Sequence, residues 1–359
     1  MIVNTIDNGN QVSIKVIGVG GAGSNAVDRM IQVGIPAVEF VAANTDAQAL
    51  SRCEAPHKVQ LGRTLTRGLG AGGSASLGAE AAEQSRDELL DAVRGADMVF
   101  IAAGMGGGTG TGAGPVIARI ARQQEALTIA VVSKPFAFEG GRRCSIAGTG
   151  IERLQEHVDT LVVVSNDRLL EVVDRHVSLD LAFRIADEVL RQGVQGISEL
   201  VTRPGLINLD FADVRSVMDR GGGALVSLGH GEGKDKALKA AEIALRSPLL
   251  DIGSISGTDG LLVNITGGED LTLAEVDSAM ELLYQAAVSG AKVLFGVVID
   301  PKMADRVQIT LIATGLGAEK TIAAPLEEES VSLSEVFGED LAVPAFMRSP
   351  AYAGAGWRN

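Results

Sequence analysis

Glycines that follow short apolar runs are the residues of this sequence best placed to do chemistry. Gly18, Gly20 and Gly23 match the pattern G-x-G-x-x-G and lie between an apolar run and a helical pattern over 26–33. Glycine lets the backbone approach a phosphate closely, and the first turn of a helix offers unpaired N–H groups and the positive end of its dipole. The pattern indicates a phosphate site, but a tight strand-to-helix turn without a ligand would look the same.

A second glycine-rich segment strengthens the phosphate interpretation. Gly104–Gly114 follows an apolar run, and Pro115 is expected to open a helix over 116–122, because proline in a first helical turn costs no hydrogen bond. A third cluster, Gly68–Gly73, could cover the end of a phosphate chain. The pattern G-x-x-x-x-G-K-[ST] does not occur, so this is not a P-loop sequence. The three segments predict a nucleotide whose phosphates are held mainly by backbone N–H groups.

The composition excludes several classes of protein. The 359 residues include 31 Lys and Arg against 45 Asp and Glu, and the net charge of −14 repels polyanions, so no nucleic-acid partner is expected. The two cysteines cannot build a disulfide framework or a metal cluster, and the four histidines lack ligand spacing. No leader segment and no apolar run near the ~20 residues of a membrane span occurs. We expect a soluble protein of a reducing cytoplasm, without direct membrane insertion.

The elements that must position the glycines follow an α/β pattern. After a segment 1–12 that we expect to be disordered, residues 13–179 alternate β-branched runs with amphipathic stretches, which predicts a nucleotide-binding domain with a Rossmann-like parallel sheet. The runs lack strict alternation, which is typical of strands buried on both faces. The expected strands are Ile14–Val19, Val38–Ala43, Asp97–Ala102, Thr128–Ser133 and Thr160–Val164.

A long helix is expected to connect this domain to a second, smaller one. Apolar residues recur at steps of three and four from Leu181 to Thr202, which predicts a central connecting helix over 180–203. Residues 204–317 are interpreted as a smaller α/β domain, followed by a flexible acidic linker over 318–340 and a C-terminal tail over 341–359. The expected elements of the second domain are helices Lys234–Arg246 and Leu273–Val288 and strands Ala224–Leu228, Gly260–Thr266, Lys292–Ile299 and Arg306–Ala313.

Several motifs together give the chain a family resemblance. Gly106–Gly112, with the sequence GGGTGTG, resembles the signature of the tubulin/FtsZ family. The match continues over roughly residues 14–315 and is closer to the FtsZ branch, the bacterial cell-division GTPases, than to tubulin. The further motifs are Asn44–Leu50, Lys134–Gly140, Asn166–Leu170 and Asn208–Met218. The resemblance implies a GTPase with GTP or GDP as its ligand.

The resemblance also implies where the nucleotide binds. Glu139 and Arg143 would hold the ribose side, and Asn166 would complete the site. Phe183 would stack on guanine, and Asp187 would accept from its N1 and exocyclic amine, because a carboxylate facing two adjacent donors suits guanine and not adenine. The phosphate contacts would come from Gly20, Gly21, Ala22, Gly23, Ser24, Asn25, Gly107, Gly108, Thr109 and Gly110, with Ala71, Gly72 and Gly73 near the γ-phosphate.

Three residues after the long helix form the implied catalytic set. A helix that begins near Asp210 places Asp213 one turn on and on the same side, so both carboxylates can face one water. Acids in a first helical turn are otherwise common as partners of the helix dipole. The resemblance implies that Asp210 and Asp213 polarise the attacking water and that Asn208 positions it, at the γ-phosphate of the next subunit. Mg²⁺ would be held mainly by phosphates and water.

The implied partners follow from the same resemblance. A repeated head-to-tail contact between copies of the chain builds an open filament. Val343–Arg348 resembles the short C-terminal peptide through which FtsZ proteins meet membrane-tethering and division-regulating proteins, and the implied location is the cytoplasm at the division site. Two departures stand out, because Ser74–Ser76 replaces a frequent Asn-Pro-Glu and Ser165 replaces a frequent proline.

Two other functions compete with this interpretation. An NAD-dependent oxidoreductase would use Gly18–Gly23 with Glu39 or Asp46 as the ribose acid, but it gives the second glycine segment no role. A GTP-binding filament scaffold without turnover is the other alternative, and the presence of all three implied catalytic residues argues against it. Binding of guanosine but not adenosine nucleotides would exclude the oxidoreductase. Hydrolysis of GTP would exclude the scaffold without turnover.

Overall fold

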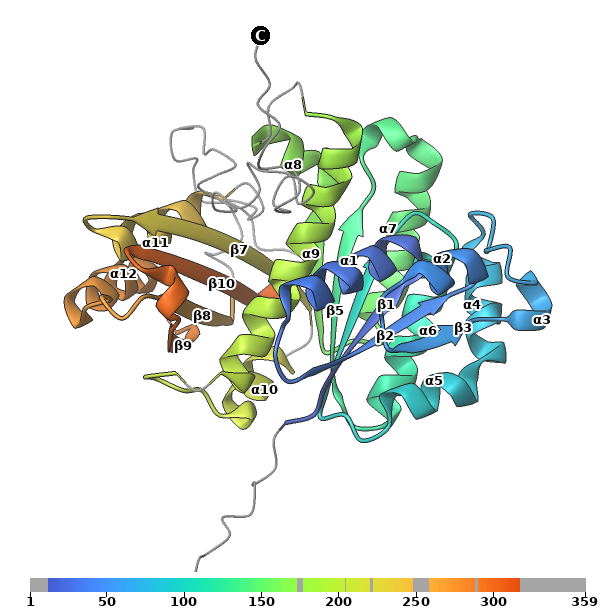
Figure 1. The fold of residues 1–359 in the computed structure, drawn as a ribbon, viewed down its shortest axis with the longest axis horizontal. Coiled ribbons are helices and arrows are strands. Elements are labelled where there is room, and N and C mark those ends of the chain that lie inside the picture. Colours follow the sequence, from blue (N-terminus) through green and yellow to red (C-terminus); the bar gives the residue numbers. More distant parts are fainter. Residues whose placement is uncertain are drawn as a thin grey trace, which may run out of the picture.

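A computed structural model describes residues 12–172, 177–203, 205–219, 222–247, 258–287 and 290–316 of the chain. Nearly all of the expected N-terminal segment, the whole linker and the tail with Val343–Arg348 lie outside the described residues. One long helix runs between two regions of sheet (Figure 1). Within the described ranges, no helix has the length and apolar character needed to cross a membrane.

Six parallel strands form the N-terminal half of the sheet, in the order β3-β2-β1-β4-β5-β6. Because all six run in one direction, their carboxyl ends meet at one edge, where parallel sheets commonly bind ligands. This is the parallel sheet predicted from the sequence. The strands are β1 (Ile14–Val19), β2 (Val38–Asn44), β3 (His57–Gln60), β4 (Met98–Gly104), β5 (Leu127–Lys134) and β6 (Thr160–Ser165).

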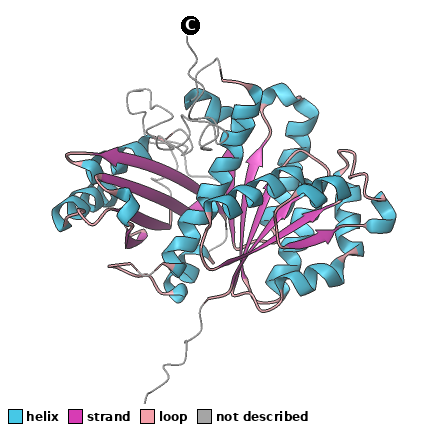
Figure 2. Cartoon of the chain, in the orientation of Figure 1, coloured by secondary structure: helices cyan, strands magenta, loops and turns pink. Residues whose placement is uncertain are grey.

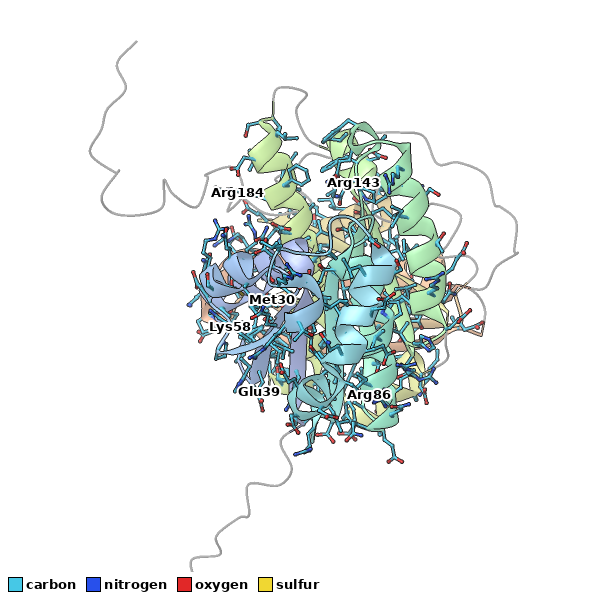
Figure 3. All side chains as sticks on the ribbon, turned by 90° about the vertical axis from the view of Figure 1, so that its right-hand side faces the viewer. Met30, Glu39, Lys58, Arg86, Arg143 and Arg184 are labelled. Atoms are coloured by element: carbon cyan, nitrogen blue, oxygen red, sulfur yellow. The ribbon has the colours of Figure 1, made fainter. Side chains whose placement is uncertain are left out.

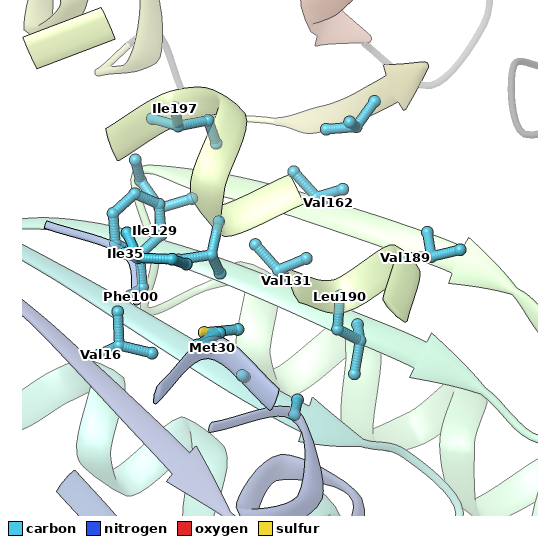
Figure 4. Close-up of a cluster of buried hydrophobic side chains, with 14 of the residues drawn as sticks. Val16, Met30, Ile35, Phe100, Ile129, Val131, Val162, Val189, Leu190 and Ile197 are labelled. Atoms are coloured by element: carbon cyan, nitrogen blue, oxygen red, sulfur yellow. The ribbon is translucent and has the colours of Figure 1, made fainter. Parts of the chain in front are cut away.

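Helices cover both faces of these strands (Figure 2). On one face, α1 (Gly20–Val33) and α9 (Leu179–Thr202) pack on alternate strand residues, and Met30 and Leu190 meet Val131 in a buried cluster (Figure 4). The opposite face carries a second core. Its helices are α4 (Ala75–Gln84), α5 (Arg86–Val93), α6 (Thr109–Gln123) and α7 (Gly141–Gln155), while the short α2 (Ala47–Arg52), α3 (Arg63–Thr66) and α8 (Asn166–Val172) lie in the connections.

The C-terminal half continues the same sheet. A short parallel contact pairs Leu161 and Val162 of β6 with the first two residues of β7, so the described strands form one ten-stranded sheet ending in the order β7-β10-β8-β9. A third buried cluster lies under α11 and α12. The elements of this half are α10 (Phe211–Met218), β7 (Gly223–Glu232), α11 (Lys236–Arg246), β8 (Gly260–Gly267), α12 (Leu273–Ala286), β9 (Lys292–Ile299) and β10 (Arg306–Leu316).

The sequence expectation for Pro115 is wrong. Helix α6 already begins at Thr109, and Pro115 lies inside it rather than at its first turn. The first turn is built from glycine and threonine, which by propensity belong in a loop. Close packing explains the helix, because a Cβ at Gly112 would lie only 2.0 Å from the carbonyl oxygen of Ala75. In the same way α1 begins at Gly20, six residues before the helical pattern in the sequence.

Candidate functional site

Two helix N-termini converge where neighbouring strands β1 and β4 end. Helix α1 follows β1 without an intervening loop, and α6 begins five residues after β4. A Cβ placed on Gly20 would lie 3.1 Å from the backbone nitrogen of Gly110 and 3.3 Å from the Cβ of Thr109. The first N–H groups of a helix have no partner within it, so both helices direct free donors and positive dipole ends to one place. This arrangement suits a polyanion.

The glycines of the first segment have different tasks. Gly21 and Asn25 are exposed in the first turns of α1, and a Cβ on Gly21 would meet open space. Gly23 is buried, and a Cβ there would lie 2.2 Å from the carbonyl oxygen of Ala102 on β4. Ser24 is also buried, and its hydroxyl donates to the carbonyl of Gly20 at 2.8 Å. Gly23 therefore lets α1 pack on the sheet, while Gly21 and Asn25, beside half-buried Ala22, are accessible to a ligand.

The third glycine cluster closes over the second. A Cβ on Gly108 would lie 2.8 Å from the Cβ of Ala71 and 3.0 Å from the backbone nitrogen of Ser74. Gly72 and Gly73 have positive φ values, are exposed and have open space where a side chain would be. Ser74 caps α4 by accepting from the N–H of Leu77 at 3.3 Å. The departure at Ser74–Ser76 therefore still provides a helix cap, and the residues on either side of the two exposed glycines pack against Gly108.

Side-chain hydroxyls fix the start of α6. The N–H of Gly106 donates to the hydroxyl of Thr111 at 2.9 Å, and the N–H of Gly112 donates to the carbonyl of Gly108 at 3.0 Å as the first helical bond. The hydroxyl of Thr109 lies 2.6 Å from the hydroxyl of Thr45, at the end of β2. Gly107, half-buried, has open space where a side chain would be. The N–H groups of Thr109 and Gly110 are thus held in place ahead of the first helical bond.

An ion pair lies at the start of α7, where the backbone of Arg143 approaches Gly106 of the second glycine segment. Glu139 accepts from the N–H of Phe136 at 3.0 Å and pairs through its other oxygen with Arg143. The carboxylate of Asp167 accepts from the N–H of Ala137 at 2.8 Å and holds the same turn. Figure 3 places Arg143 at the same end of the molecule as Arg184, near the start of α9. The Glu139 carboxylate and the Arg143 guanidinium supply an acceptor and a donor of the kind that ribose hydroxyls need.

An aromatic group and a buried acid lie at the start of α9. Phe183 is 39% exposed and makes an edge contact with buried Phe136, at 5.4 Å between ring centres. This contact holds the ring of Phe183 in place and leaves one of its faces for stacking. Asp187, one turn further on, is only 9% exposed and lies 3.6 Å from the guanidinium of Arg29 on α1. Burial raises the pKa of Asp187 from 3.8 to about 7, although Arg29 acts to lower it.

One buried polar atom in this region has no hydrogen-bond partner. Asn166 is 5% exposed, and its side-chain oxygen accepts nothing among the described residues. An orphaned acceptor of this kind costs free energy unless a ligand or water satisfies it. Asn166 begins α8, directly after β6 and therefore at the same edge of the sheet as the glycine segments. The free backbone donors, the ring face of Phe183, the carboxylate of Asp187 and the oxygen of Asn166 together fit a guanine nucleotide.

The implied catalytic residues lie at the other end of α9. Asn208 and Asp210 are exposed and Asp213 is half-buried, with Asp210 preceding α10 and Asp213 in its first turn, as the sequence predicts. Both acids therefore lie at the N-terminal end of α10, within one helical turn of each other. Between Asp187 and the end of α9 lie about 22 Å of helix at about 1.5 Å per residue, and Figure 1 places α8 and α10 at opposite ends of α9. The acids cannot reach the nucleotide site of their own chain.

The loop that carries Asn208 is fixed by hydrogen bonds. The N–H of Gly205 donates to the side-chain oxygen of Asn208, an exposed residue whose amide NH₂ takes no part in this hydrogen bond. The N–H of Leu206 donates to the carbonyl of Val297 on β9 at 2.8 Å. No group of three or more His, Cys, Asp or Glu side chains in the described part of the chain could hold a metal ion.

The two acids that an oxidoreductase would use for the ribose have other partners in the fold. Glu39 pairs in register with Lys15 near the amino ends of their strands, and Figure 3 places it far from Arg143. The carboxylate of Asp46 caps α2 by accepting from the N–H groups of Gln48 and Ala49 at 2.8 and 3.0 Å. Glu39 therefore lies far from the glycine segments, and one carboxylate oxygen of Asp46 is engaged as a helix cap.

Three residues that support the candidate site were not identified from the sequence. Arg29 pairs with Asp187, Thr45 with Thr109, and Asp167 holds the turn before Glu139. Thr45 belongs to the motif Asn44–Leu50 and Asp167 to the motif Asn166–Leu170, so the motifs indicated their regions but not their contacts. Nothing in the sequence indicates Arg29, because its partner is distant along the chain.

Comparison with known proteins gives consistent matches. Residues 13–174 match the tubulin/FtsZ family GTPase domain, and residues 222–317 match the FtsZ family C-terminal domain. The chain is 42% identical to an empty FtsZ dimer structure from M. jannaschii, with a TM-score of 0.82 over 88% of this chain and 96% of that chain. The structure of a point mutant of FtsZ from M. jannaschii is 45% identical, with a TM-score of 0.82 over 85% and 92%. CetZ2 from Haloferax volcanii, at 23% identity and a TM-score of 0.73 over 85% and 94%, shares the fold.

Proposed function

Because the chain belongs to the tubulin/FtsZ family of GTPases, we propose that it assembles head to tail into cytoskeletal filaments and hydrolyses GTP at the contact between subunits. As a family member it binds guanine nucleotides and is a GTPase. A structure of FtsZ from M. jannaschii is described as a dimer, and a structure of CetZ2 is described as a GTPγS-bound protofilament. The proposal extends this assembly to the present chain.

In the proposed complex, backbone donors carry the phosphates. The N–H groups at the starts of α1 and α6 bind them, and Ala71–Gly73 lies beside the terminal one. Glu139 and Arg143 bind the ribose. The ring of Phe183 stacks on the base, and the side-chain oxygen of Asn166 accepts a hydrogen bond that it lacks without ligand. Asp187 in its ionised form accepts from the two adjacent guanine donors, which adenine does not offer.

The observation that carries the proposal of a shared site is the position of the catalytic loop. Asp210 and Asp213 are separated from the site of their own chain by the length of α9, and Asp210 is exposed while Asp213 is half-buried. In a head-to-tail contact they face the nucleotide of the next subunit. There the two carboxylates polarise the attacking water, and the amide NH₂ of Asn208 helps to position this water. Two half-sites on opposite ends of one chain give an open filament.

Mg²⁺ would be held in the proposed site mainly by the nucleotide phosphates and water, and it would neutralise charge on the phosphate oxygens. The task of the protein is to position the phosphates through Thr109, Gly110 and Gly21.

We further assign the chain to the ring of filaments at the division site, through its similarity to FtsZ proteins. Val343–Arg348 is the proposed contact to membrane-tethering and division-regulating proteins, and it lies outside the described residues.

The decisive experiment measures GTP hydrolysis per subunit against protein concentration, with Mg²⁺ present and light scattering recorded in parallel. A site shared between subunits predicts a rate per subunit that rises at a threshold, together with scattering. A constant rate per subunit down to nanomolar protein would mean a self-contained site. Scattering without hydrolysis at any concentration would contradict hydrolysis at the contact between subunits.

A further inference from the structure

Two threonine hydroxyls from different elements meet beside the start of α6. The oxygens of Thr45 and Thr109 lie 2.6 Å apart, a short hydrogen bond for two neutral hydroxyls. Thr45 is completely buried at the end of β2, whereas Thr109 is half-buried in the first turn of α6. Thr109 also lies next to Gly20, so its hydroxyl is at the point where the two helix N-termini converge. The Thr45 hydroxyl is therefore in the protein interior, and the Thr109 hydroxyl borders the candidate site.

The interior hydroxyl is held by a rigid backbone. The carbonyl of Thr45 accepts from the N–H of Gly70 at 3.2 Å and lies 3.2 Å from the hydroxyl of buried Thr66. The N–H of Ala47 donates to the carbonyl of Gly68 at 3.0 Å, so the third glycine segment holds both sides of Thr45. A β-branched side chain with a fixed backbone has few rotamers. The Thr45 oxygen is thus a fixed point against which Thr109 is oriented.

The direction of this hydrogen bond decides what Thr109 offers to a ligand. If Thr109 donated to Thr45, its lone pairs would face the site and repel a phosphate oxygen. If Thr45 donates, Thr109 accepts and keeps its own proton for a phosphate oxygen. A hydroxyl that already accepts one hydrogen bond is also a better donor, because bonded hydroxyls polarise each other.

We propose that Thr45 is a positioning residue for nucleotide binding: it donates to Thr109 and so directs the Thr109 hydroxyl proton to a phosphate oxygen of the guanine nucleotide. This inference rests on the proposed nucleotide site and adds a residue that does not itself touch the ligand. Thr111, two residues further on, differs because its hydroxyl accepts from the N–H of Gly106 and holds the loop.

The test replaces the Thr45 hydroxyl without changing its volume. Thr45→Val is expected to weaken equilibrium GTP binding about tenfold, measured without Mg²⁺ so that hydrolysis does not interfere, since a hydrogen bond to a charged group contributes about that factor. Thr45→Ser keeps the hydroxyl and is expected to bind within twofold of the unaltered protein. Thr45→Ala removes the hydroxyl without adding a methyl group and is expected to behave like Thr45→Val, even if the valine variant folds poorly.

A double-mutant cycle connects the effect to Thr109. In the Thr109→Val background, Thr45→Val is expected to weaken binding no further, because the proton that it directs is gone. Thr128→Val is the matched control, since Thr128 is a completely buried threonine at the amino end of β5, away from the site. It is expected to lower the midpoint of thermal unfolding as Thr45→Val does, but to leave GTP binding unchanged.

Three results would overturn the proposal. Unchanged GTP binding by Thr45→Val would mean that its hydroxyl has no part in nucleotide binding. Equal weakening by Thr45→Ser, which keeps the hydroxyl, and Thr45→Val, which lacks it, would mean that packing around residue 45 and not the hydroxyl causes the effect. Full additivity of Thr45→Val and Thr109→Val would make the two residues independent. Failure of the proposed nucleotide site itself gives a different result, because Thr109→Val and Gly21→Ala would then both bind GTP normally.

Discussion

The backbone N–H of Val297 donates to the carbonyl of Ile207 at 3.0 Å, which joins the loop before α10 to the outer edge of β9. The N–H of Leu206 returns a hydrogen bond to the carbonyl of Val297. The residues proposed to act on a neighbouring nucleotide are thus held by the C-terminal half of the chain, whereas the nucleotide is held by the N-terminal half. The catalytic loop and the nucleotide-binding segments are therefore each held by the strands of a different part of the sheet.

The contact with β9 predicts the effect of Gly205→Ala. A Cβ on Gly205 would lie 2.3 Å from the carbonyl oxygen of Val297, so the loop must shift. We expect hydrolysis to fall at least about tenfold, because small displacements of catalytic groups are costly, while GTP affinity stays within twofold. Gly148→Ala in α7, where a Cβ meets open space, is the control and should change neither quantity. Equal loss of affinity and turnover in Gly205→Ala would contradict a role confined to the loop.

Asp213→Ala is expected to abolish turnover and leave binding intact. Removing a carboxylate that polarises the attacking water costs about 100-fold or more. Asp219→Ala is the matched control, because Asp219 follows the last residue of the same helix and lies on the surface. Steady-state hydrolysis and equilibrium GTP binding measure the two effects. Weakened binding in Asp213→Ala would place this acid at the nucleotide of its own chain.

Two glycines of α1 are expected to respond in opposite ways to alanine. Gly23→Ala brings a Cβ to 2.2 Å from the carbonyl oxygen of Ala102, so the midpoint of thermal unfolding should fall clearly in the absence of nucleotide. Gly21→Ala meets open space without ligand and should leave that midpoint unchanged. If phosphate occupies this space, Gly21→Ala should weaken GTP binding about tenfold. Normal binding by Gly21→Ala would mean that the phosphates do not approach the start of α1.

The burial of Asp187 predicts a conflict between stability and binding. Its pKa is raised to about 7 in the folded protein, mainly by burial, so the folded chain holds this proton more tightly than the unfolded chain does. The ionised carboxylate therefore lowers stability, and this loss begins above about pH 4 and is complete above about pH 7. Asp187→Asn should raise the unfolding midpoint of the nucleotide-free protein at pH 8 by a few degrees, and by less at pH 5.5.

Guanine binding should show the opposite dependence. Only the ionised form of Asp187 accepts from both guanine donors, so the affinity for GDP should fall towards tenfold per pH unit below about pH 7. Asp187→Asn should bind GDP weakly at every pH. Asp180→Asn, an exposed acid in the first turn of the same helix, is the control for both measurements. Affinity that is flat from pH 5.5 to 8 would contradict recognition of guanine by this carboxylate.

Much of the fold was predictable because its strands are buried on both faces. The apolar runs predicted β1, β2, β4, β5 and β6 to within two residues at each end. The strand β3 was missed because His57–Gln60 is short and largely polar, with one buried residue. Gly110 and Gly112 were interpreted as loop because propensity ignores tertiary packing, which here requires residues without side chains in a helix.

The types of residue at the site were predictable, but their pairing was not. The motifs indicated Asp187, yet its burial and its contact with Arg29 depend on how α1 crosses α9. Thr45 and Thr109 are 64 residues apart, and only the order of strands β2, β1 and β4 brings them together. The anchoring of Ile207 on Val297 likewise depends on the edge position of β9. Contacts distant in sequence have no local signal.

The most direct test of a shared catalytic site mixes two inactive variants. Asp213→Ala provides an intact nucleotide site without the acid, and Asp187→Asn provides the acid with an impaired nucleotide site. In a mixed filament of equal parts, about a quarter of the contacts join both intact halves, so hydrolysis should rise well above that of either variant alone. Light scattering confirms that the mixture assembles. A mixture that assembles but hydrolyses GTP no faster than the mean of its two components would contradict catalysis between subunits.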